Sequence, residues 1–168
     1  MNTHLIYSEK LSSKKTELLF IALALLFLLL FIWGFIVGSV DFLAGIFFFF
    51  FVVFLFYSLI YRTLVIRLTS ESLKFSFGIF SWTIPLNNVG EIQPDDDLPM
   101  LMKYGGAGIH FMFIRKRYRA SFNFLEHSRV VIGLKRKAGL VRDISFSTCQ
   151  PNELIRLIQG AKSANKTA

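Results

Sequence analysis

Positively charged side chains gather at two turns in the second half of the sequence. The first basic cluster comprises Arg115, Lys116, Arg117 and Arg119, and the second comprises Lys135, Arg136 and Lys137. Guanidinium and ammonium groups at this density bind anionic lipid headgroups or an acidic protein surface, while the alternative is a solvated turn without a ligand. We do not expect nucleic acid as a partner, because the clusters lack the interleaved aromatic side chains of a base-stacking platform.

Carboxylate, imidazole and thiol groups offer a second set of candidates. Asp95–Asp97 supply the oxygen ligands that Ca²⁺ and Mg²⁺ prefer, but no glycine-spaced loop or distant glutamate completes a known geometry. We interpret this run as a solvated acidic loop or a docking patch for a basic partner. His4, His110 and His127 are isolated in sequence from one another and from Cys149, without metal-binding or triad spacing. The sequence therefore predicts no catalytic residue, no metal site and no cofactor.

A glycine-rich segment precedes one of the predicted strands. Gly105, Gly106 and Gly108 resemble the glycine spacing of loops that hold phosphate through backbone amides. That chemistry needs a following helix and a lysine next to serine or threonine, whereas a strand pattern follows here. We predict a bend or bulge where the strand begins.

Charge and cysteine content limit the class of protein. The 168 residues suffice for one ordinary domain and a membrane anchor. The net charge of +8 belongs to the residues from Arg62 onward, where 16 basic residues stand against 8 acidic ones. A basic domain held at a bilayer will face anionic headgroups. The single cysteine, Cys149, excludes an intramolecular disulfide and suits a reducing compartment.

Two long stretches of the N-terminal third carry no charged residue. They run from Leu18 to Val40 and from Phe42 to Tyr61, and only Asp41 separates them. A helix of about 20 apolar residues crosses the hydrocarbon layer of a bilayer. A single long helix would place Asp41 in mid-membrane, and a cleaved signal peptide has a shorter apolar core. We therefore predict a two-helix transmembrane hairpin at residues 17–61, with helices at about 18–39 and 42–61.

The orientation of this hairpin follows from its flanking charges. Lys10, Lys14 and Lys15 precede the first helix, Arg62 and Arg67 follow the second, and the intervening turn has no basic residue. Basic residues accumulate on the cytoplasmic side of membrane helices. We therefore expect a multi-pass protein of the cell (plasma) membrane with both termini in the cytoplasm.

Small and aromatic residues within the hairpin suggest how its helices pack. Gly34 and Gly38 form a G-x-x-x-G pair, a spacing that lets two helices approach closely, either within the hairpin or between two copies. The aromatic run Phe47–Phe51 is interpreted as lipid-facing bulk, because packed membrane seams prefer small residues.

The hydrophobic period changes to two after the second helix. Apolar residues alternate with polar ones in several short segments from Thr63 to Ser147, separated by turn residues. His110 alternates with apolar neighbours and is expected to face outward. About seven short strands of this kind predict an α+β domain that is a small barrel or sandwich. We favour an antiparallel barrel capped by one C-terminal helix. Pro151 suits the first position of that helix, and Gly160 suits its end.

The predicted organisation leaves almost no linker between the membrane helices and the domain, because Tyr61 and Thr63 are separated by a single residue. The domain must therefore sit against the headgroups with one face toward lipid. The predicted parts are a cytoplasmic N-terminal segment at 1–16, the hairpin at 17–61, the barrel domain at 62–162 and a flexible tail at 163–168.

Four short segments carry a family resemblance. They are Leu68-Thr69-Ser70-Glu71-Ser72-Leu73, Ile84-Pro85-Leu86-Asn87-Asn88-Val89, Tyr104-Gly105-Gly106-Ala107-Gly108-Ile109 and Gln150-Pro151-Asn152-Glu153-Leu154. In this order, the sequence resembles prokaryotic membrane proteins that have a pleckstrin-homology-like (PH-like) domain after a two-helix hairpin. The resemblance implies a PH-like fold between about Tyr61 and Ala161. It does not imply phosphoinositide binding, because no residues match a known headgroup pocket.

These observations favour a non-enzymatic, membrane-anchored adaptor. Its basic clusters are expected to contact inner-leaflet lipid or a protein partner, or to support a homo-oligomer. The alternative is an accessory or assembly subunit of a larger membrane complex, with the phenylalanine-rich hairpin packed against other helices. A membrane-bound enzyme is the third hypothesis, which the missing acid–base pairs disfavour.

Overall fold

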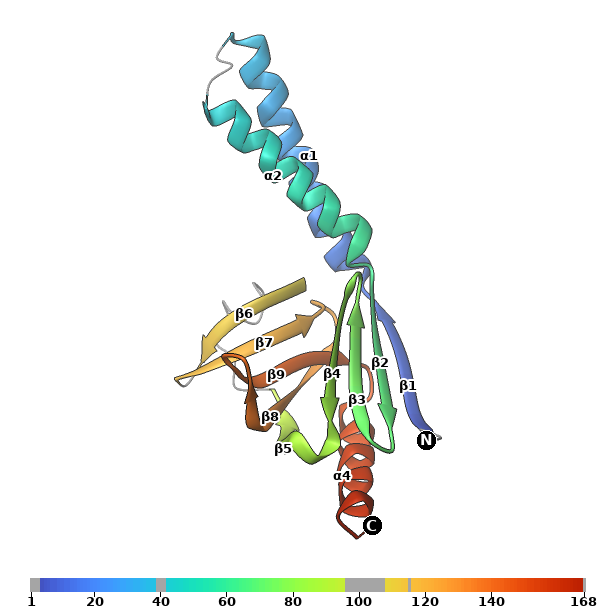
Figure 1. The fold of residues 1–168 in the computed structure, drawn as a ribbon. Coiled ribbons are helices and arrows are strands. Elements are labelled where there is room, and N and C mark those ends of the chain that lie inside the picture. The colour runs from blue at the N-terminus through green and yellow to red at the C-terminus, as the bar shows by residue number, and fades with distance from the viewer. Residues whose placement is uncertain (1–3, 39–41, 96–107, 115, 168) are drawn as a thin grey trace.

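A projecting pair of helices and a domain built from two β-sheets make up the fold (Figure 1). The computed structural model describes residues 4–38, 42–95, 108–114 and 116–167. The helices are α1 (Lys14–Ile36), α2 (Phe42–Ile60) and α4 (Pro151–Thr167), with a short 3₁₀ helix, η1 (Leu86–Asn88). The strands are β1 (Leu5–Ser12), β2 (Thr63–Thr69), β3 (Ser72–Phe77), β4 (Phe80–Pro85), β5 (Val89–Pro94), β6 (Gly108–Ile114), β7 (Arg117–Asn123), β8 (Ser128–Ala138) and β9 (Val141–Thr148).

Strand β1 comes before the helices in sequence but belongs to the sheet that follows them. It pairs antiparallel with β2, and the last pair of this ladder joins Ser12 to Thr63. Both ends of the helical hairpin therefore continue directly into neighbouring strands. The sequence pattern predicts strands only after the second helix, so β1 is an addition to the predicted fold. Its partner lies more than fifty residues away, and local periodicity carries no information on such a pairing.

The domain consists of two open sheets, and the predicted PH-like barrel is not confirmed. One sheet has the order β1-β2-β3-β4 and the other has the order β5-β8-β9-β7-β6. Nine strands lie in the described residues, where about seven were predicted, and neither sheet closes. The pair β7 and β9 is parallel, whereas all other pairs are antiparallel. The coarser prediction of an α+β fold with apolar helices and a C-terminal helix is confirmed.

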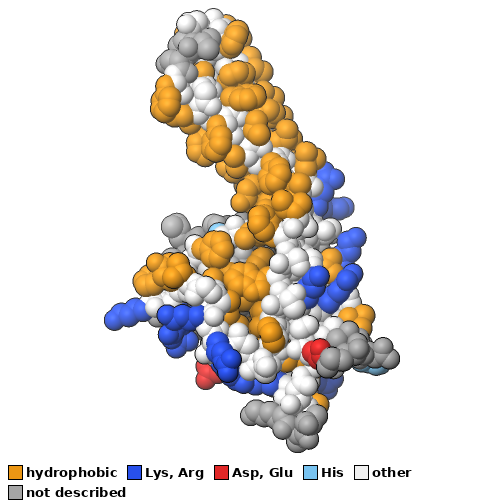
Figure 2. Space-filling model, in the orientation of Figure 1, with side chains coloured by type: hydrophobic (Ala, Val, Ile, Leu, Met, Phe, Trp, Pro, Cys, Tyr) orange, Lys and Arg blue, Asp and Glu red, His pale blue; other side chains and the backbone are white. Residues whose placement is uncertain are grey.

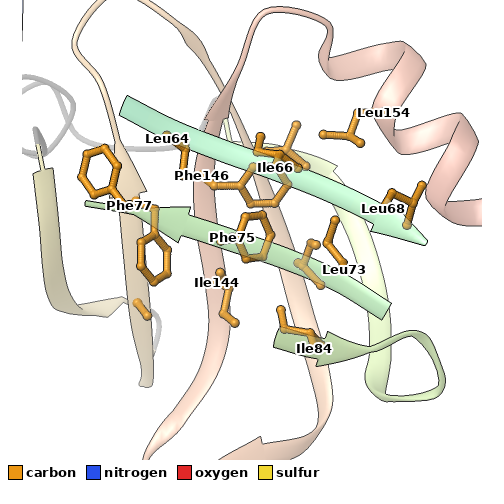
Figure 3. Packing of buried hydrophobic residues seen from close by; sticks show 14 of the residues in the cluster. Leu64, Ile66, Leu68, Leu73, Phe75, Phe77, Ile84, Ile144, Phe146 and Leu154 are labelled. Atoms are coloured by element: carbon orange, nitrogen blue, oxygen red, sulfur yellow. The ribbon is translucent and has the colours of Figure 1, made fainter. Parts of the chain in front are cut away.

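The core lies between the two sheets and one face of α4 (Figure 3). Alternate residues of β2 and β3 point inward, which places Phe75 against Phe146 of the opposite sheet, with ring centroids 4.5 Å apart. Leu154 and Ile158 of α4 are fully buried and complete the core. Each such side chain stabilises the fold by about 1.5–3 kcal/mol through burial. The alternation of apolar and polar residues from which these strands were predicted therefore matches the side chains that are buried in the core.

Helices α1 and α2 are each long and apolar enough to cross a membrane. Helix α1 begins before the predicted position because Ser13 caps it, its hydroxyl accepting a hydrogen bond from the Thr16 amide at 3.0 Å. Gly38, with φ at +77°, lies just past the C-cap, so α1 ends at Ile36 and not at about 39. Asp41, the predicted turn residue, lies outside the described residues.

The C-terminal helix α4 begins at Pro151, as predicted, but does not end at Gly160. It continues to Thr167, across most of the predicted flexible tail. Two side chains of its last turns hold it to the domain: Lys162 Nζ donates to the Gly90 carbonyl at 2.6 Å, and Asn165 Nδ2 donates to the Ser70 carbonyl at 2.5 Å. These tertiary contacts outweigh the weak helix propensity of glycine.

Candidate functional site

The foot of the helical hairpin is bonded to the domain on both sides. Thr16, buried in the first turn of α1, accepts a hydrogen bond through Oγ1 from the Leu125 amide at 3.2 Å. Glu17 forms an ion pair with Arg62, which follows α2, at 2.8 Å. These contacts join the start of α1, the end of α2 and the turn between β7 and β8. The domain therefore has one orientation relative to the helices.

Strand β6 begins against the two helices. Gly108, its first residue, has φ at +92°, and a Cβ at this position would lie 3.5 Å from Phe20 Cζ and 3.6 Å from Tyr57 Cε1. This φ lies in the left-handed region that favours glycine, while Gly105 and Gly106, the other glycines of the predicted bend, lie outside the described residues. From this point β6 runs outward, away from the foot of the hairpin (Figure 1).

The two predicted basic clusters lie at the same end of one sheet. Strands β7 and β9 are parallel neighbours, with Tyr118 paired to Val141, so the turns that precede them are adjacent. Lys116 occupies the first turn in the left-handed region, with φ at +63°, and its side chain is exposed. Lys137, near the second turn, is also exposed. The sequence predicted both clusters, and the parallel pairing brings them together.

Within the first cluster, the side chains of Arg117 and Arg119 have opposite environments. Arg117 is exposed and lies 3.7 Å from Asp143. Arg119 is buried and forms an ion pair with Asp95 at 2.7 Å, so its inclusion among surface contact residues is wrong. Although alternation places both side chains on one face of β7, only Arg119 is covered. Arg115 lies outside the described residues.

The second cluster is anchored to the short helix η1. Lys135 Nζ donates to the Asn87 carbonyl at 2.8 Å, and the Arg136 amide donates to Asn88 Oδ1 at 2.7 Å. Asn88 returns a hydrogen bond from Nδ2 to the Arg136 carbonyl at 3.1 Å. The backbone of this hairpin is therefore held in place, and its cations have a defined position on the surface.

The acidic run that was considered for metal binding has a structural role at its described end. Asp95 accepts from Arg119 through Oδ1, and from Ser145 Oγ through Oδ2 at 2.7 Å. Asp96 and Asp97 lie outside the described residues. Within the described ranges, no group of three or more acidic, histidine or cysteine side chains is arranged to hold a metal ion.

Cys149 and His127 are neighbours in space, contrary to their isolation in sequence. Cys149 Sγ lies 3.5 Å from His127 Nδ1, and His127 Nε2 lies 3.0 Å from the Ser12 carbonyl. Because a carbonyl only accepts, Nε2 carries the proton and Nδ1 accepts from the thiol. Burial, together with the Glu9 carboxylate that accepts from the Cys149 amide at 2.8 Å, raises the pKa of the thiol. This setting disfavours the thiolate that a nucleophilic cysteine requires.

His110 on β6 was expected to face outward, but its side chain is partly covered in the structure. The side chain is half-buried, and Nε2 has no hydrogen-bond partner within the described part of the chain. Desolvation by burial, reinforced by the nearby positive charge of Arg129, lowers the pKa of the imidazole. The ring is thus held in its neutral form.

Exposed aromatic side chains next to the basic turns were not identified from the sequence. Phe111 and Phe113 on β6 are 66% and 60% exposed, and Tyr118 and Leu140 are also exposed. Phe111 and Phe113 could have been recognised from their position directly before the basic turn. Aromatic residues next to basic ones are typical of the membrane–water interface.

The two glycines of the hairpin have different environments. Gly34 is buried within α1, as are Ala24 of the same helix and Ala44 of α2, so the buried positions are mostly small. Gly38 lies just past the C-cap of α1, and a Cβ there would meet no described atom within 4 Å, so it makes no close contact inside the hairpin. Packing of Gly38 between two copies stays a prediction. Phenylalanines also enter the seam, because Phe27 lies 5.2 Å from Phe50 between ring centroids.

Comparison with known proteins adds no family assignment. A scan of protein-family models, a search of curated proteins and a search of solved structures each found no match to this chain.

Proposed function

We propose that this protein is a non-enzymatic adaptor anchored in the cell membrane by α1 and α2, with both termini in the cytoplasm and its domain against the inner leaflet. The observation that carries this proposal is the Ser12–Thr63 pair, because both apolar helices continue from one β-ladder without a flexible linker. The domain then presents one fixed surface to the bilayer. A relationship to PH-like domains remains part of the proposal, supported by two largely antiparallel sheets followed by a packed C-terminal helix.

The surface chemistry supports this placement. On the face shown in Figure 2, hydrophobic side chains cover the projecting helices, and lysine and arginine are confined to the domain and the foot of the hairpin. Lys116 and Lys137 are exposed at one end of the five-stranded sheet, where they can contact anionic headgroups or an acidic partner. Basic residues at a helix foot indicate the cytoplasmic side.

Cysteine labelling in membrane vesicles tests the orientation. The sole cysteine, Cys149, is exposed on the domain and should react with an impermeant maleimide only in inside-out vesicles. A Val37→Cys variant in a Cys149→Ser background should react only in right-side-out vesicles, because Val37 lies at the far end of α1. Labelling of Cys149 from the outside, or extraction of the chain by carbonate, would contradict the proposal.

Purification in mild detergent distinguishes an adaptor from an accessory subunit. An adaptor should be recovered alone or as a small homo-oligomer after crosslinking in native membranes. Stoichiometric companion chains that persist through purification would instead identify the protein as a subunit of a larger complex.

A further inference from the structure

We propose that the β6–β7 hairpin is a second membrane-contact element, which lies in the headgroup layer of an anionic bilayer. Phe111 and Phe113 reach the boundary of the acyl chains, and Lys116 and Arg117 contact lipid phosphates. This inference rests on the proposed function, because it requires α1 and α2 to cross the same bilayer. It assigns a lipid-binding role to aromatic side chains that the fold leaves largely exposed.

The first argument is the depth at which β6 begins. Gly108 lies against Phe20, which is six residues into α1 and already within the apolar stretch that begins at Leu18. At 1.5 Å per residue, this contact is about 9 Å along the helix from its start. Gly108 also lies against Tyr57, in the last turn of α2. Strand β6 therefore starts level with the apolar surface of the hairpin rather than below it.

The second argument is that the opposite sheet does not cover the outer part of β6. Phe111 pairs with Ala120 and Phe113 pairs with Tyr118, so both side chains lie on the face that forms the core further along β7. Ala120 is fully buried, whereas Phe111 and Phe113 are more than half exposed. Large exposed aromatic groups of this kind mark an interaction surface. In Figure 2, hydrophobic side chains continue from the helices onto this part of the domain.

The third argument is the charge at the end of the hairpin. Lys116 and Arg117 are exposed at the β6–β7 turn, and Arg142 is exposed at the start of the adjacent strand β9. In a bilayer, aromatic rings settle at the boundary of the acyl chains and cations pair with the lipid phosphates. The β6–β7 hairpin carries its aromatic rings and its cations in the same order. A second copy of this chain would place these cations against one another, so we favour lipid as the occupant.

Depth-dependent fluorescence quenching of the full-length chain tests the inference. Single cysteines at Phe111 or Phe113, in a Cys149→Ser background, carry an environment-sensitive fluorophore in vesicles of phosphatidylcholine with phosphatidylglycerol. Leu18, which is exposed on α1, serves as the membrane control, and Glu71, in the β2–β3 turn away from the helices, as the aqueous control. Replacing the exposed phenylalanines leaves the core unchanged.

We expect the labels at 111 and 113 to lose most of their fluorescence to lipid-attached spin labels and little to aqueous iodide, as at position 18. If iodide quenched the labels at 111 and 113 as strongly as the label at 71, the inference would be overturned. The proposed function would still hold in that case, provided that the label at position 18 was quenched by the lipid-attached spin labels. Iodide access at position 18 would instead overturn both. Protection that also occurs in detergent and depends on protein concentration would assign the surface to a second copy and exclude lipid.

Charge reversal gives an independent readout. The double variant Lys116→Glu/Arg117→Glu should shift the label at position 111 toward the aqueous signal in vesicles containing phosphatidylglycerol, with a smaller change in pure phosphatidylcholine. The matched variant Lys74→Glu/Arg156→Glu reverses two cations of β3 and α4, outside the five-stranded sheet, and should have no effect. Equal responses from both variants would contradict a specific role for the β6–β7 turn.

Discussion

Ser12 and Thr63 form the last pair of the β1–β2 ladder, at the point where β1 leads into α1 and α2 leads into β2. Two helices and two strands thus meet at one position, and the Glu17–Arg62 ion pair lies directly beside it. Rotation of the hairpin relative to the domain would have to break this ion pair and the hydrogen bond from the Leu125 amide to Thr16. The surface that carries the basic clusters therefore has a fixed orientation relative to the helices.

The capping hydroxyl of Ser13 should contribute measurably to this junction. Ser13→Ala removes the acceptor for the Thr16 amide and should lower the free energy of unfolding by about 1 kcal/mol. Thermal unfolding of the full chain in detergent measures the change. Ser12→Ala, at the exposed neighbouring position, is the control and should have little effect. Equal melting temperatures for the two variants would contradict a capping role.

Gly78 should be much less tolerant of alanine than Gly139. Both have φ near +60°, but a Cβ on Gly78 would lie 2.6 Å from the carbonyl oxygen of Ile60, whereas Gly139 has open space around it. Gly139→Ala should cost about 1–2 kcal/mol from backbone strain alone. Gly78→Ala should cost clearly more, because the β3–β4 turn must move away from the end of α2. Denaturant unfolding of both variants provides the comparison, and equal losses would refute the steric explanation.

The buried Asp95–Arg119 pair should be costly to break from one side. Asp95→Ala leaves the guanidinium uncompensated at a site where both side chains are less than a tenth exposed, and should destabilise the domain by about 3–5 kcal/mol. The double variant Asp95→Ala/Arg119→Met should recover much of this loss. Arg117→Ala, which removes an exposed and longer contact, should change stability by less than about 1 kcal/mol. Urea unfolding of all three variants measures these changes in stability. A small loss of stability for Asp95→Ala alone would contradict the prediction, because another group would then compensate the charge of Arg119.

Acidification should destabilise the domain through His110. Its pKa is lowered in the folded protein from an ordinary value of 6.5, by burial first and Arg129 second. The unfolded chain therefore binds a proton at a higher pH than the folded one, and stability should fall as the pH drops below about 6.5. Melting temperatures measured between neutral and mildly acidic pH should fall less steeply for His110→Gln. A variant with the same pH profile as the parent would exclude His110 as the cause.

The thiol of Cys149 should alkylate slowly at neutral pH and faster when Glu9 is neutralised. Burial and the Glu9 carboxylate raise the pKa of the thiol, which reduces the thiolate fraction. Glu9→Gln should increase the rate of reaction with iodoacetamide, and the difference should disappear at a pH above both pKa values. Glu71→Gln, an exposed carboxylate in the β2–β3 turn, should leave the rate unchanged. If Glu9→Gln reacts no faster, the carboxylate does not control the thiol.

Local patterns determined the parts of this structure that depend on neighbouring residues. Two charge-free stretches predicted two long apolar helices, because length and composition alone decide whether a helix can cross a bilayer. The alternation of Leu64, Ile66 and Leu68 predicted a buried strand face, and Pro151 predicted the start of α4. Both basic turns were also visible in the sequence, since charge density needs no knowledge of the fold.

Only the tertiary structure decided what depends on pairing between distant segments. The sequence could not show that β1 joins β2, or that β7 and β9 lie parallel and bring the two basic turns together. Nor could it separate exposed Arg117 from buried Arg119, because strand alternation places both on one face. Periodicity reports which way a side chain points from its own backbone. What covers that side chain depends on long-range packing, for which the local sequence carries no signal.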